Sequence, residues 1–216
     1  MKPRLLDLFC GAGGAAVGYH RAGFDVVGVD IKPQPHYPFE FHQADALTFP
    51  LDGFDAIHAS PPCQAYTSMR RLGKNAGRDA PELVEPTRAR LIVSGRPWVM
   101  ENVVGSPLLN PLRLCGSSFG LGVRRHRLFE SSGLIFGLPC RHDLQPEPVA
   151  VYGDHPQQPG DKTYRVRRAR TLAEGQAAMG IDWMPWRPLT QAVPPAYTEW
   201  IGARLIANLV CCLEYE

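Results

Sequence analysis

The sequence lacks several features that define whole classes of protein. It contains no apolar run long enough to cross a membrane, no internal repeat and no signal peptide. It also has no excess of charge of one sign, because the formal net charge is only +2. Any affinity for nucleic acid must therefore come from local basic patches. These absences argue against a membrane protein and a repeat array, and they indicate a soluble, cytoplasmic protein.

Cysteine is present, but without the spacing of a disulfide framework. The adjacent Cys211 and Cys212 are poor partners for each other. We interpret five of the six cysteines as packing residues in a reducing compartment: Cys10, Cys115, Cys140, Cys211 and Cys212. A metal site at Cys140 and His142 with a nearby histidine is not expected, because no second closely spaced pair of ligands accompanies them. The sequence alone thus predicts no metal.

The chain does contain enough apolar material for one α/β domain. With 216 residues, 44% of them hydrophobic, it can bury a core, and its 21 glycines and 21 prolines mark loops rather than disorder. Short apolar runs predict strands at 4–9, 25–29, 39–43, 54–59, 97–101, 112–115 and 127–131. Helices between most of them, including residues 15–22, imply a mostly parallel, twisted sheet with right-handed crossovers. A final helix is expected at 196–213, with its apolar stripe against the sheet.

Two chemically reactive side chains directly follow predicted strands. They are Cys63, in the string Pro-Pro-Cys-Gln, and Glu101, in the string Glu-Asn-Val. Open α/β sheets bind their ligands at the carboxyl ends of the strands. A thiolate is a strong nucleophile and a carboxyl group manages protons, so the pair is suited to covalent catalysis. Taken alone, however, such a cysteine is more often a small core residue, and such a glutamate caps a strand end.

A glycine-rich turn supplies the third element. Residues 10–14 (Cys-Gly-Ala-Gly-Gly) separate the first strand from the first helix, and Asp30 ends the second strand about twenty residues later. An acid at that place can hold ribose hydroxyls. The turn alone is weak evidence, but with Asp30 it favours a nucleotide-like ligand.

Taken in order, these strings resemble the motifs of the DNA (cytosine-5)-methyltransferases. The motif residues are 7–14, 30, 45, 62–64, 101–103, 125–127 and 192–195, and the resemblance runs from residue 4 to about residue 209. The compact layout is similar to that of the methyltransferases carried by bacterial viruses. The resemblance implies a Rossmann-like class I S-adenosyl methionine-dependent methyltransferase fold with a short target-recognition insert. It also implies that the last helix lies beside the first.

The resemblance further implies a role for each site residue. Cys63 would add to carbon 6 of a flipped-out cytosine, and Glu101 would contact ring nitrogen 3 and the exocyclic amine. Arg125 and Arg127, two apart on a predicted strand, are expected to point the same way, with Arg127 favoured for the base oxygen. The expected contacts to S-adenosyl-L-methionine are Phe9, Gly11, Gly13, Asp30, Ile31, Asp45, Ala46, Pro62 and Gln191. The expected contacts to double-stranded DNA are Gln64, Arg70, Arg71, Lys74, Arg165, Arg167 and Arg168.

Two basic segments carry most of the expected DNA contacts. Residues 65–81 combine basic side chains with small and glycine residues, which predicts a lid over the flipped base. Residues 162–170 contain five basic side chains and no acid inside the basic run, which suits them to DNA phosphates. An ordinary basic loop and a solvated helix face are the respective alternatives.

The expected organisation has three segments. Residues 1–131 are the catalytic and cofactor-binding part, 132–163 the short target-recognition insert, and 164–216 the return segment with the basic stretch and the last helix. The insert is far shorter than is usual in the family, which puts sequence specificity in doubt. Val123-Arg124 stand where the family has a glutamine before the paired arginines, and Thr190-Gln191 replace the usual Gly-Asn at the methionine end of the cofactor.

Other functions stay open at this point. The same chemistry on RNA or a free nucleotide is one, although the tRNA-acting relatives carry Cys-Phe-Thr, which this chain lacks. A catalytically inactive DNA-binding decoy is another, against which the intact Cys63 and Glu101 argue. Amino-group methyltransferases have no need of the cysteine. We expect a monomer in a bacterial cell, virus-encoded or not, with no membrane or metal partner. A cognate restriction nuclease and a partner that supplies specificity stay open.

Overall fold

A seven-stranded sheet forms the centre of the protein. The structure is a computed structural model that describes residues 1–66, 80–145, 147–161 and 166–213. The strand order is β3-β2-β1-β4-β5-β7-β6. The strands are β1 (Arg4–Leu8), β2 (Asp25–Asp30), β3 (Glu40–Gln43), β4 (Ala56–Ala59), β5 (Trp98–Asn102), β6 (Leu112–Leu114) and β7 (Arg127–Ser131). Strands β1 to β5 pair in parallel, whereas β7 is antiparallel to β5 and β6. All seven predicted strands and the mostly parallel α/β sheet are confirmed.

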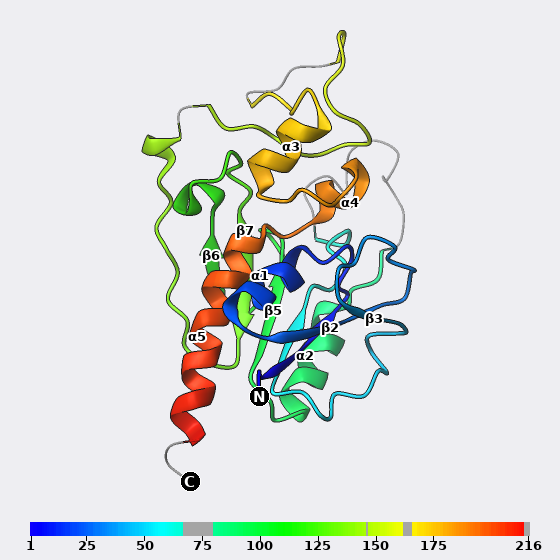
Figure 1. The fold of residues 1–216 in the computed structure, drawn as a ribbon, viewed down its shortest axis with the longest axis vertical. Helices are drawn as coiled ribbons and strands as arrows, with labels where there is room; N and C mark the ends of the chain where they lie inside the picture. Colours follow the sequence, from blue (N-terminus) through cyan, green and yellow to red (C-terminus); the bar gives the residue numbers. More distant parts are fainter. Residues whose placement is uncertain (67–79, 146, 162–165, 214–216) are drawn as a thin grey trace.

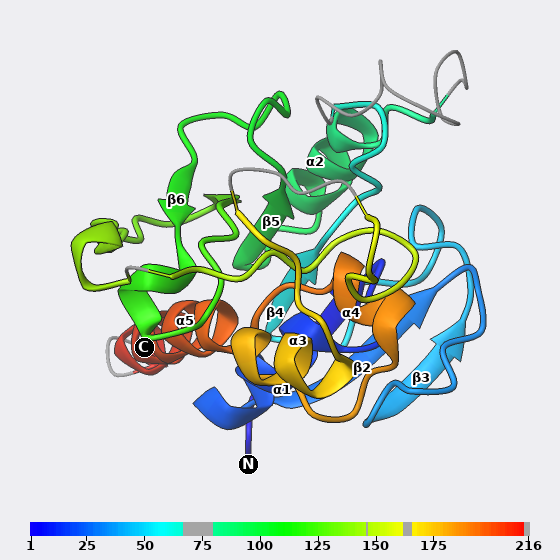
Figure 2. The ribbon, with the colours of Figure 1, turned by 90° about the horizontal axis from the view of Figure 1, so that it is seen from above.

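Helices cover both faces of this sheet (Figures 1 and 2). α1 (Gly14–Ala22) and α5 (Pro195–Leu213) lie side by side on one face, and α2 (Val84–Val93) lies on the other. Side chains alternate between the two faces of a strand, so successive residues of β1 pack in different hydrophobic clusters. Leu5 packs in the cluster with α1 and α5, and Leu6 in the cluster with α2; both are fully buried. Burial on both faces explains why the strand reads as a continuous apolar run.

The approach of α1 to α5 depends on a small residue. A Cβ atom at Gly18 would lie 2.0 Å from Oγ1 of Thr198 on α5. That hydroxyl donates to the carbonyl of Ala15 at 2.8 Å, which links the two helices. Ile201 and Leu205 of α5 are buried in the same core. The placement of the last helix beside the first, with its apolar stripe inward, is confirmed.

The helices between the strands are fewer than the sequence predicted. The described chain has no helix between β2 and β3 or between β3 and β4, so the expectation of helices between most strands is wrong. Those connections are turns. Two 3-10 helices are short, η3 (Gly116–Phe119) and η4 (His142–Leu144). None of the helices among the described residues combines the length and apolar character that a membrane crossing needs.

Two helices that the sequence analysis missed lie beyond the carboxyl edge of the sheet (Figure 1). They are α3 (Leu172–Met179) and α4 (Trp186–Gln191). α3 begins at a capping pair that could have been recognised: Oγ1 of Thr171 accepts the N–H of Glu174, whose carboxylate accepts the N–H of Arg170. Around Met179 and Trp186 these helices form a small separate core with residues 149 and 151 of the expected insert.

The expected insert has little regular structure in its described part. Between residues 132 and 161, η4 is the one helix that the structure describes, in keeping with the loss of periodicity in the sequence. The segment is nevertheless tied down. The N–H of Val149 donates to the carbonyl of Gly122 at 2.8 Å, and Ala150 forms an isolated parallel bridge with Arg168.

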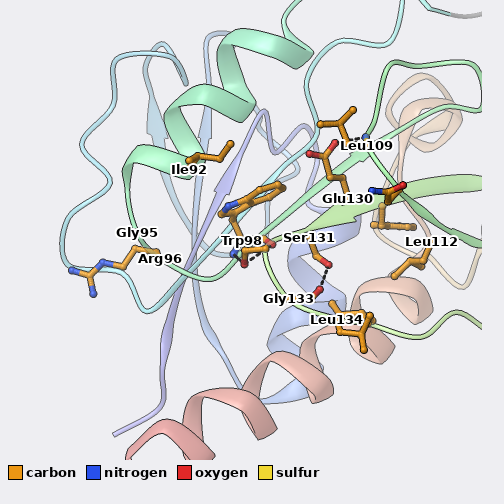
Figure 3. Close-up of a pocket in the computed structure, with 14 residues that line it drawn as sticks. Ile92, Gly95, Arg96, Trp98, Leu109, Leu112, Glu130, Ser131, Gly133 and Leu134 are labelled. Atoms are coloured by element: carbon orange, nitrogen blue, oxygen red, sulfur yellow. Dashed lines mark hydrogen bonds between the residues drawn. The ribbon is translucent and has the colours of Figure 1, made fainter.

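A hollow of about 650 Å³ lies at the amino end of β5 (Figure 3). Trp98, Leu112, Glu130 and Leu134 line it. The buried carboxylate in this hollow belongs to Glu130, which forms an ion pair with Arg88 at 2.7 Å. This hollow shares no lining residue with the cavity described next.

Candidate active site

A cavity of about 550 Å³ lies at the carboxyl ends of β1, β4 and β5. It brings together three chain segments that the sequence analysis had selected separately: the glycine turn, the Pro-Pro-Cys-Gln loop and the end of β5. The expected site residues that line it are Phe9, Gly11, Asp30, Ile31, Pro62, Cys63, Gln64, Glu101, Arg127 and Gln191. Residues 187–193, from α4 to the turn before α5, close one side.

The glycine turn is held in a tight conformation by Asp30. One carboxylate oxygen accepts the N–H of Gly11 at 3.1 Å, and the other accepts the N–H of Lys32 at 2.9 Å. Phe9 and Gly13 have φ values of 57° and 83°, a region that disfavours most side chains. Asp30 thus has a structural role in addition to the expected contact with the cofactor.

The loop that carries Cys63 is anchored by the residue after Glu101. The side-chain amide of Asn102, which is buried, donates to the carbonyl of Pro61 at 2.9 Å. The N–H of Tyr66 donates to the carbonyl of Cys63 at 2.9 Å and closes a turn. The Asn of the Glu-Asn-Val string therefore positions the loop that carries Cys63, a role that the sequence analysis did not assign.

Glu101 is a buried carboxylate with two partners. Its side chain is only 8% exposed, and Oε1 lies 3.0 Å from Nε of Arg127. Burial raises the pKa of Glu101 above its usual value, and the charge of Arg127 and a hydrogen bond from Ser60 oppose that rise. Burial thus favours the protonated form of Glu101, whereas its two partners favour the charged form.

A chain of hydrogen bonds leads from Glu101 into the core. Nε2 of His58 lies 2.9 Å from the hydroxyl of Ser60, and Nδ1 lies 3.0 Å from the hydroxyl of Tyr19. Burial lowers the pKa of His58 to about 3, so the imidazole is neutral. With Nε2 protonated, each member donates to the next, and Ser60 is left to donate to Glu101. No motif in the sequence predicted this chain of hydrogen bonds.

Cys63 rests as a thiol in this cavity. Burial is the largest effect that raises its pKa, and the nearby Glu101 adds to it. The charges of Arg127 and Arg125 lower the pKa of Cys63. The cysteine thus requires loss of its proton before it can act as a nucleophile.

The two arginines have different hydrogen-bond partners, although the charges of both act on Cys63 and Glu101. Arg127 lines the cavity, whereas the Arg125 side chain donates to the carbonyls of Val151 at 3.1 Å and Thr190 at 2.5 Å. Strand β7 begins only at Arg127, so Arg125 lies outside the alternation that the argument required. Its backbone carbonyl also accepts the hydroxyl of Tyr197 at 2.7 Å. Arg125 therefore ties the insert and α4 to the segment that leads into β7.

Three of the expected cofactor residues are not among those that line the cavity: Gly13, Asp45 and Ala46. Asp45 accepts the N–H of Leu47 at 2.9 Å and so caps a turn. Ala46 is buried in the core on the α2 side of the sheet. The structure brings Asp30 to the cavity, but it does not bring Asp45.

Only some of the residues expected to contact DNA lie in the part of the chain that the structure describes. Residues 70, 71, 74 and 165 lie outside the described residues, as does most of the predicted lid. Arg167 is partly exposed and pairs with Glu174 at 2.7 Å. Arg168 pairs with Asp161, and its side chain is only 12% exposed. Arg168 is therefore engaged inside the protein, which leaves Arg167 as the better placed of the two for a phosphate.

Asp7 is a cavity residue that belongs to the first motif but received no role in the sequence analysis. It is fully buried, and both of its carboxylate oxygens are among the buried polar atoms without a hydrogen-bond partner in the described chain. Burial, and secondarily the charge of Asp30, raise its pKa well above the usual value. Buried polar groups are normally satisfied, so an unpaired acid in a cavity points to a ligand with positive charge or donors.

Comparison with known proteins agrees with this geometry. The family model for C-5 cytosine-specific DNA methylase matches residues 3–107, which include Cys63 and Glu101. Type II methyltransferase M1.HphI of Haemophilus parahaemolyticus is 30% identical over 123 residues, covering 48% of this chain and 33% of that protein. Type II methyltransferase M.AquIA of Picosynechococcus sp. is 26% identical over 176 residues, covering 64% of this chain and 68% of that protein.

Solved structures share the fold over nearly the whole chain. A candidate DNA modification methyltransferase encoded within an E. coli prophage has a TM-score of 0.62 at 16% identity, with 96% of this chain and 99% of that chain covered. The S. pombe Dnmt2 methyltransferase has a TM-score of 0.62 at 15% identity, with coverages of 97% and 99%. The fold is thus that of the α/β S-adenosyl methionine-dependent methyltransferases. Residues 3–107 of the chain are thus similar to the C-5 cytosine-specific DNA methylases.

Proposed function

We propose that the protein methylates carbon 5 of cytosine in double-stranded DNA, with Cys63 as the covalent nucleophile. One observation carries the proposal: Cys63, Glu101 and Arg127 line the same cavity as the glycine turn and Asp30. A single cavity can therefore hold a base against the thiol and a methyl donor beside it. The family domain includes the cysteine and the glutamate, which supports the assignment.

C-5 DNA methyltransferases use S-adenosyl-L-methionine as the methyl donor, and the cavity fits this cofactor. The cofactor carries a sulfonium and an ammonium group, and the unpaired carboxylate of Asp7 offers a counter-charge. Asp30 lines the cavity with spare acceptor capacity for ribose hydroxyls. Ile31 is 65% exposed beside it and offers an apolar surface to an adenine ring. When bound, the cofactor supplies the methyl group.

The remaining chemistry belongs to the side chains. Carbon 5 of cytosine is a poor nucleophile until the Cys63 thiol gives its proton to solvent and its sulfur forms a bond to carbon 6. That addition sends an electron pair toward ring nitrogen 3, where Glu101 holds the proton that neutralises it. The methyl group then takes the place of the carbon 5 proton, which leaves to a base. Breaking the bond from sulfur to carbon 6 restores the ring and the thiolate.

Arg127 supports both reacting groups. Burial raises the pKa of Cys63 and of Glu101, and the charge of Arg127 lowers both. The ion pair with Arg127 also fixes the orientation of the Glu101 carboxylate. A guanidinium at this place is also suited to hold the oxygen of the base. Because the cavity lies at the edge of a sheet, a cytosine stacked in a duplex cannot enter it. The target base therefore flips out of the helix before reaction.

The DNA-binding face is assigned to the insert and the return segment. Residues 132–163 would read the target and 164–216 would close the catalytic part, while Gln64 contacts the flipped base or its gap. Few side chains of so short an insert can reach base edges, and each good pair discriminates by about 1–3 kcal/mol. The target is therefore short or degenerate, and phosphate contacts such as Arg167 supply much of the affinity.

Bisulfite sequencing of DNA from a host without cytosine methylation of its own tests the function. Expression of the wild-type chain should protect cytosines in a recurring sequence context. Cys63→Ala should abolish protection, whereas Cys211→Ala, in the C-terminal part of α5, should retain it. Incubation of purified protein with labelled cofactor and either DNA or RNA separates the substrates. Methylation of RNA alone, or protection that persists in Cys63→Ala, would overturn the proposal.

A further inference from the structure

Four metal-ligating side chains converge at the start of β7, outside the catalytic cavity. They are Cys115, His126, Cys140 and His142, whose donor atoms all lie within 4.8 Å of one another. Sγ of Cys115 is 3.3 Å from Nε2 of His142, and Sγ of Cys140 is 3.4 Å from Nε2 of His126. In a tetrahedral zinc site, with bonds of about 2.3 Å to sulfur and 2.0–2.1 Å to nitrogen, neighbouring donor atoms are about 3.5 Å apart. An ion at the centre of this cluster would require little movement of its ligands.

The four ligands come from three separate segments of the chain. Cys115 follows β6, His126 precedes β7, and Cys140 and His142 lie in the insert. The sequence shows only the last two as a close pair, which is why spacing argued against a metal site. The fold supplies the second pair from residues 115 and 126, and in doing so completes a full set of four protein ligands.

The segments are held in place by hydrogen bonds around the cluster. The hydroxyl of Ser117 accepts the N–H of Arg141 at 3.0 Å, and the hydroxyl of Ser118 donates to the carbonyl of Pro139 at 2.7 Å. The amide of Gln145 donates to the carbonyl of Leu121 at 2.6 Å. These contacts join η3 and the loop after it to the insert on either side of the ligands. The ligand geometry is therefore supported by its surroundings.

The donor set selects among metals. Two thiolates and two neutral imidazoles favour zinc over magnesium or calcium, which prefer oxygen ligands. Two thiolates also neutralise a divalent ion, which reduces the cost of placing it beside the buried Cys115. With four protein ligands the site has no open position, which is typical of structural rather than catalytic zinc.

We propose that Cys115, His126, Cys140 and His142 bind one structural zinc ion that fastens the insert to the start of the catalytic strand β7. His126 lies directly before Arg127, which pairs with Glu101 at 3.0 Å in the cavity. The ion thus fixes the backbone from which the catalytic arginine extends. It also supplies to a short, irregular insert the rigidity that its own small core does not provide.

Two metal-free arrangements compete with this site. The same thiols and imidazoles could remain as a hydrogen-bonded cluster, because Cys115 also lies 3.1 Å from the hydroxyl of Ser117. Cys115 and Cys140 could also form a disulfide under oxidation. The two arrangements and the zinc site differ in metal content and in the mass of the chain.

Metal analysis of the untagged protein tests the proposal. Protein purified without chelator from zinc-supplemented cells should contain about one zinc ion per chain by plasma mass spectrometry. Replacement of zinc by cobalt should give the visible absorption of a tetrahedral site with thiolate ligands. A strong chelator should lower the thermal midpoint of unfolding, and added zinc should restore it.

Variants assign the ligands and keep the test independent of folding. Cys140→Ser and His142→Ala should lose the zinc, whereas His155→Ala, a histidine of the insert outside the cluster, should keep it. Cys140→His retains a possible ligand and should recover binding, with a cobalt spectrum shifted by the loss of one thiolate. Wild-type protein without zinc and without a tetrahedral cobalt spectrum would overturn the proposal. So would a mass lower by two hydrogens from a disulfide in the freshly purified chain, or equal zinc in all variants.

Discussion

Replacement of Asp7 by asparagine should make the cofactor-free protein more stable and weaken its affinity for the cofactor. Asp7 is fully buried, both of its oxygens lack a partner in the described chain, and its pKa is raised chiefly by burial. Asp7→Asn keeps the shape and removes the charge. Asparagine leaves buried polar atoms at this place but cannot ionise, and each unit by which burial raises the pKa of Asp7 corresponds to about 1.4 kcal/mol. We expect a gain in unfolding free energy of that order at pH 8.

The sign of the pH dependence follows from the raised pKa. The unfolded chain ionises Asp7 near its ordinary value of about 3.9, whereas the folded chain holds the proton to higher pH. Stability is therefore lost as pH rises from the unfolded value toward the folded one. The difference in unfolding free energy between Asp7→Asn and wild type should therefore grow as pH rises through this range. It should vanish near pH 4. Urea unfolding from pH 4 to 8 measures it.

Cofactor binding should respond in the opposite direction. If Asp7 supplies the counter-charge for the cofactor, the wild-type affinity rises with pH as the carboxyl ionises, and Asp7→Asn removes this rise. A loss of about 1–3 kcal/mol corresponds to roughly 5- to 150-fold weaker binding by calorimetry at pH 8. Asp45→Asn, a turn cap outside the cavity lining, is the matched control and should bind normally. A cofactor-free Asp7→Asn protein less stable than wild type at pH 8, with unchanged affinity, would refute the reasoning.

Three further predictions concern the cavity. Asp30→Ala should weaken cofactor binding by about 1–3 kcal/mol, and by more than Asp45→Ala, because only Asp30 lines the cavity and holds the glycine turn; equal calorimetric losses would contradict this. Ser60→Ala removes the hydrogen bond to Glu101, so kcat should fall about tenfold with little change in KM for DNA, and a change in KM alone would count against a positioning role. Because burial raises the pKa of Cys63, the single-turnover rate should increase as pH rises above 7, and a rate that falls there would show that a different group limits the reaction.

The sequence predicted most of the fold and the centre of the site, for a physical reason. Buried parallel strands require continuous apolar runs, and catalytic chemistry requires particular residue types at strand ends, so both leave a local signature in the chain. Cys63 and Glu101 were selected in this way and Arg127 by its place in a motif, and the structure brings all three to one cavity. The helices α3 and α4 carry weak periodicity and were missed, although the capping pair at Thr171 and Glu174 marks one of them.

What the sequence could not supply depends on contacts between distant segments. Arg125 donates to carbonyls of residues 151 and 190, and the hydrogen-bond chain from His58 to Glu101 joins two strands. The metal-ligating cluster joins residues 115 and 126 to residues 140 and 142. In each case the partner is chosen by the fold, and no spacing along the chain reveals it.

The central claim is that Cys63 forms a covalent bond to the target base, and trapping that bond tests it most directly. In DNA containing 5-fluorocytosine, fluorine replaces the proton that must leave carbon 5, so the enzyme cannot complete the reaction. Wild-type protein with cofactor should form a complex that survives denaturing electrophoresis, with Cys63 as the linked residue by peptide mass spectrometry. Cys63→Ala should form none, and neither should wild type without cofactor. A stable adduct in Cys63→Ala, or attachment at another residue in wild type, would contradict the account.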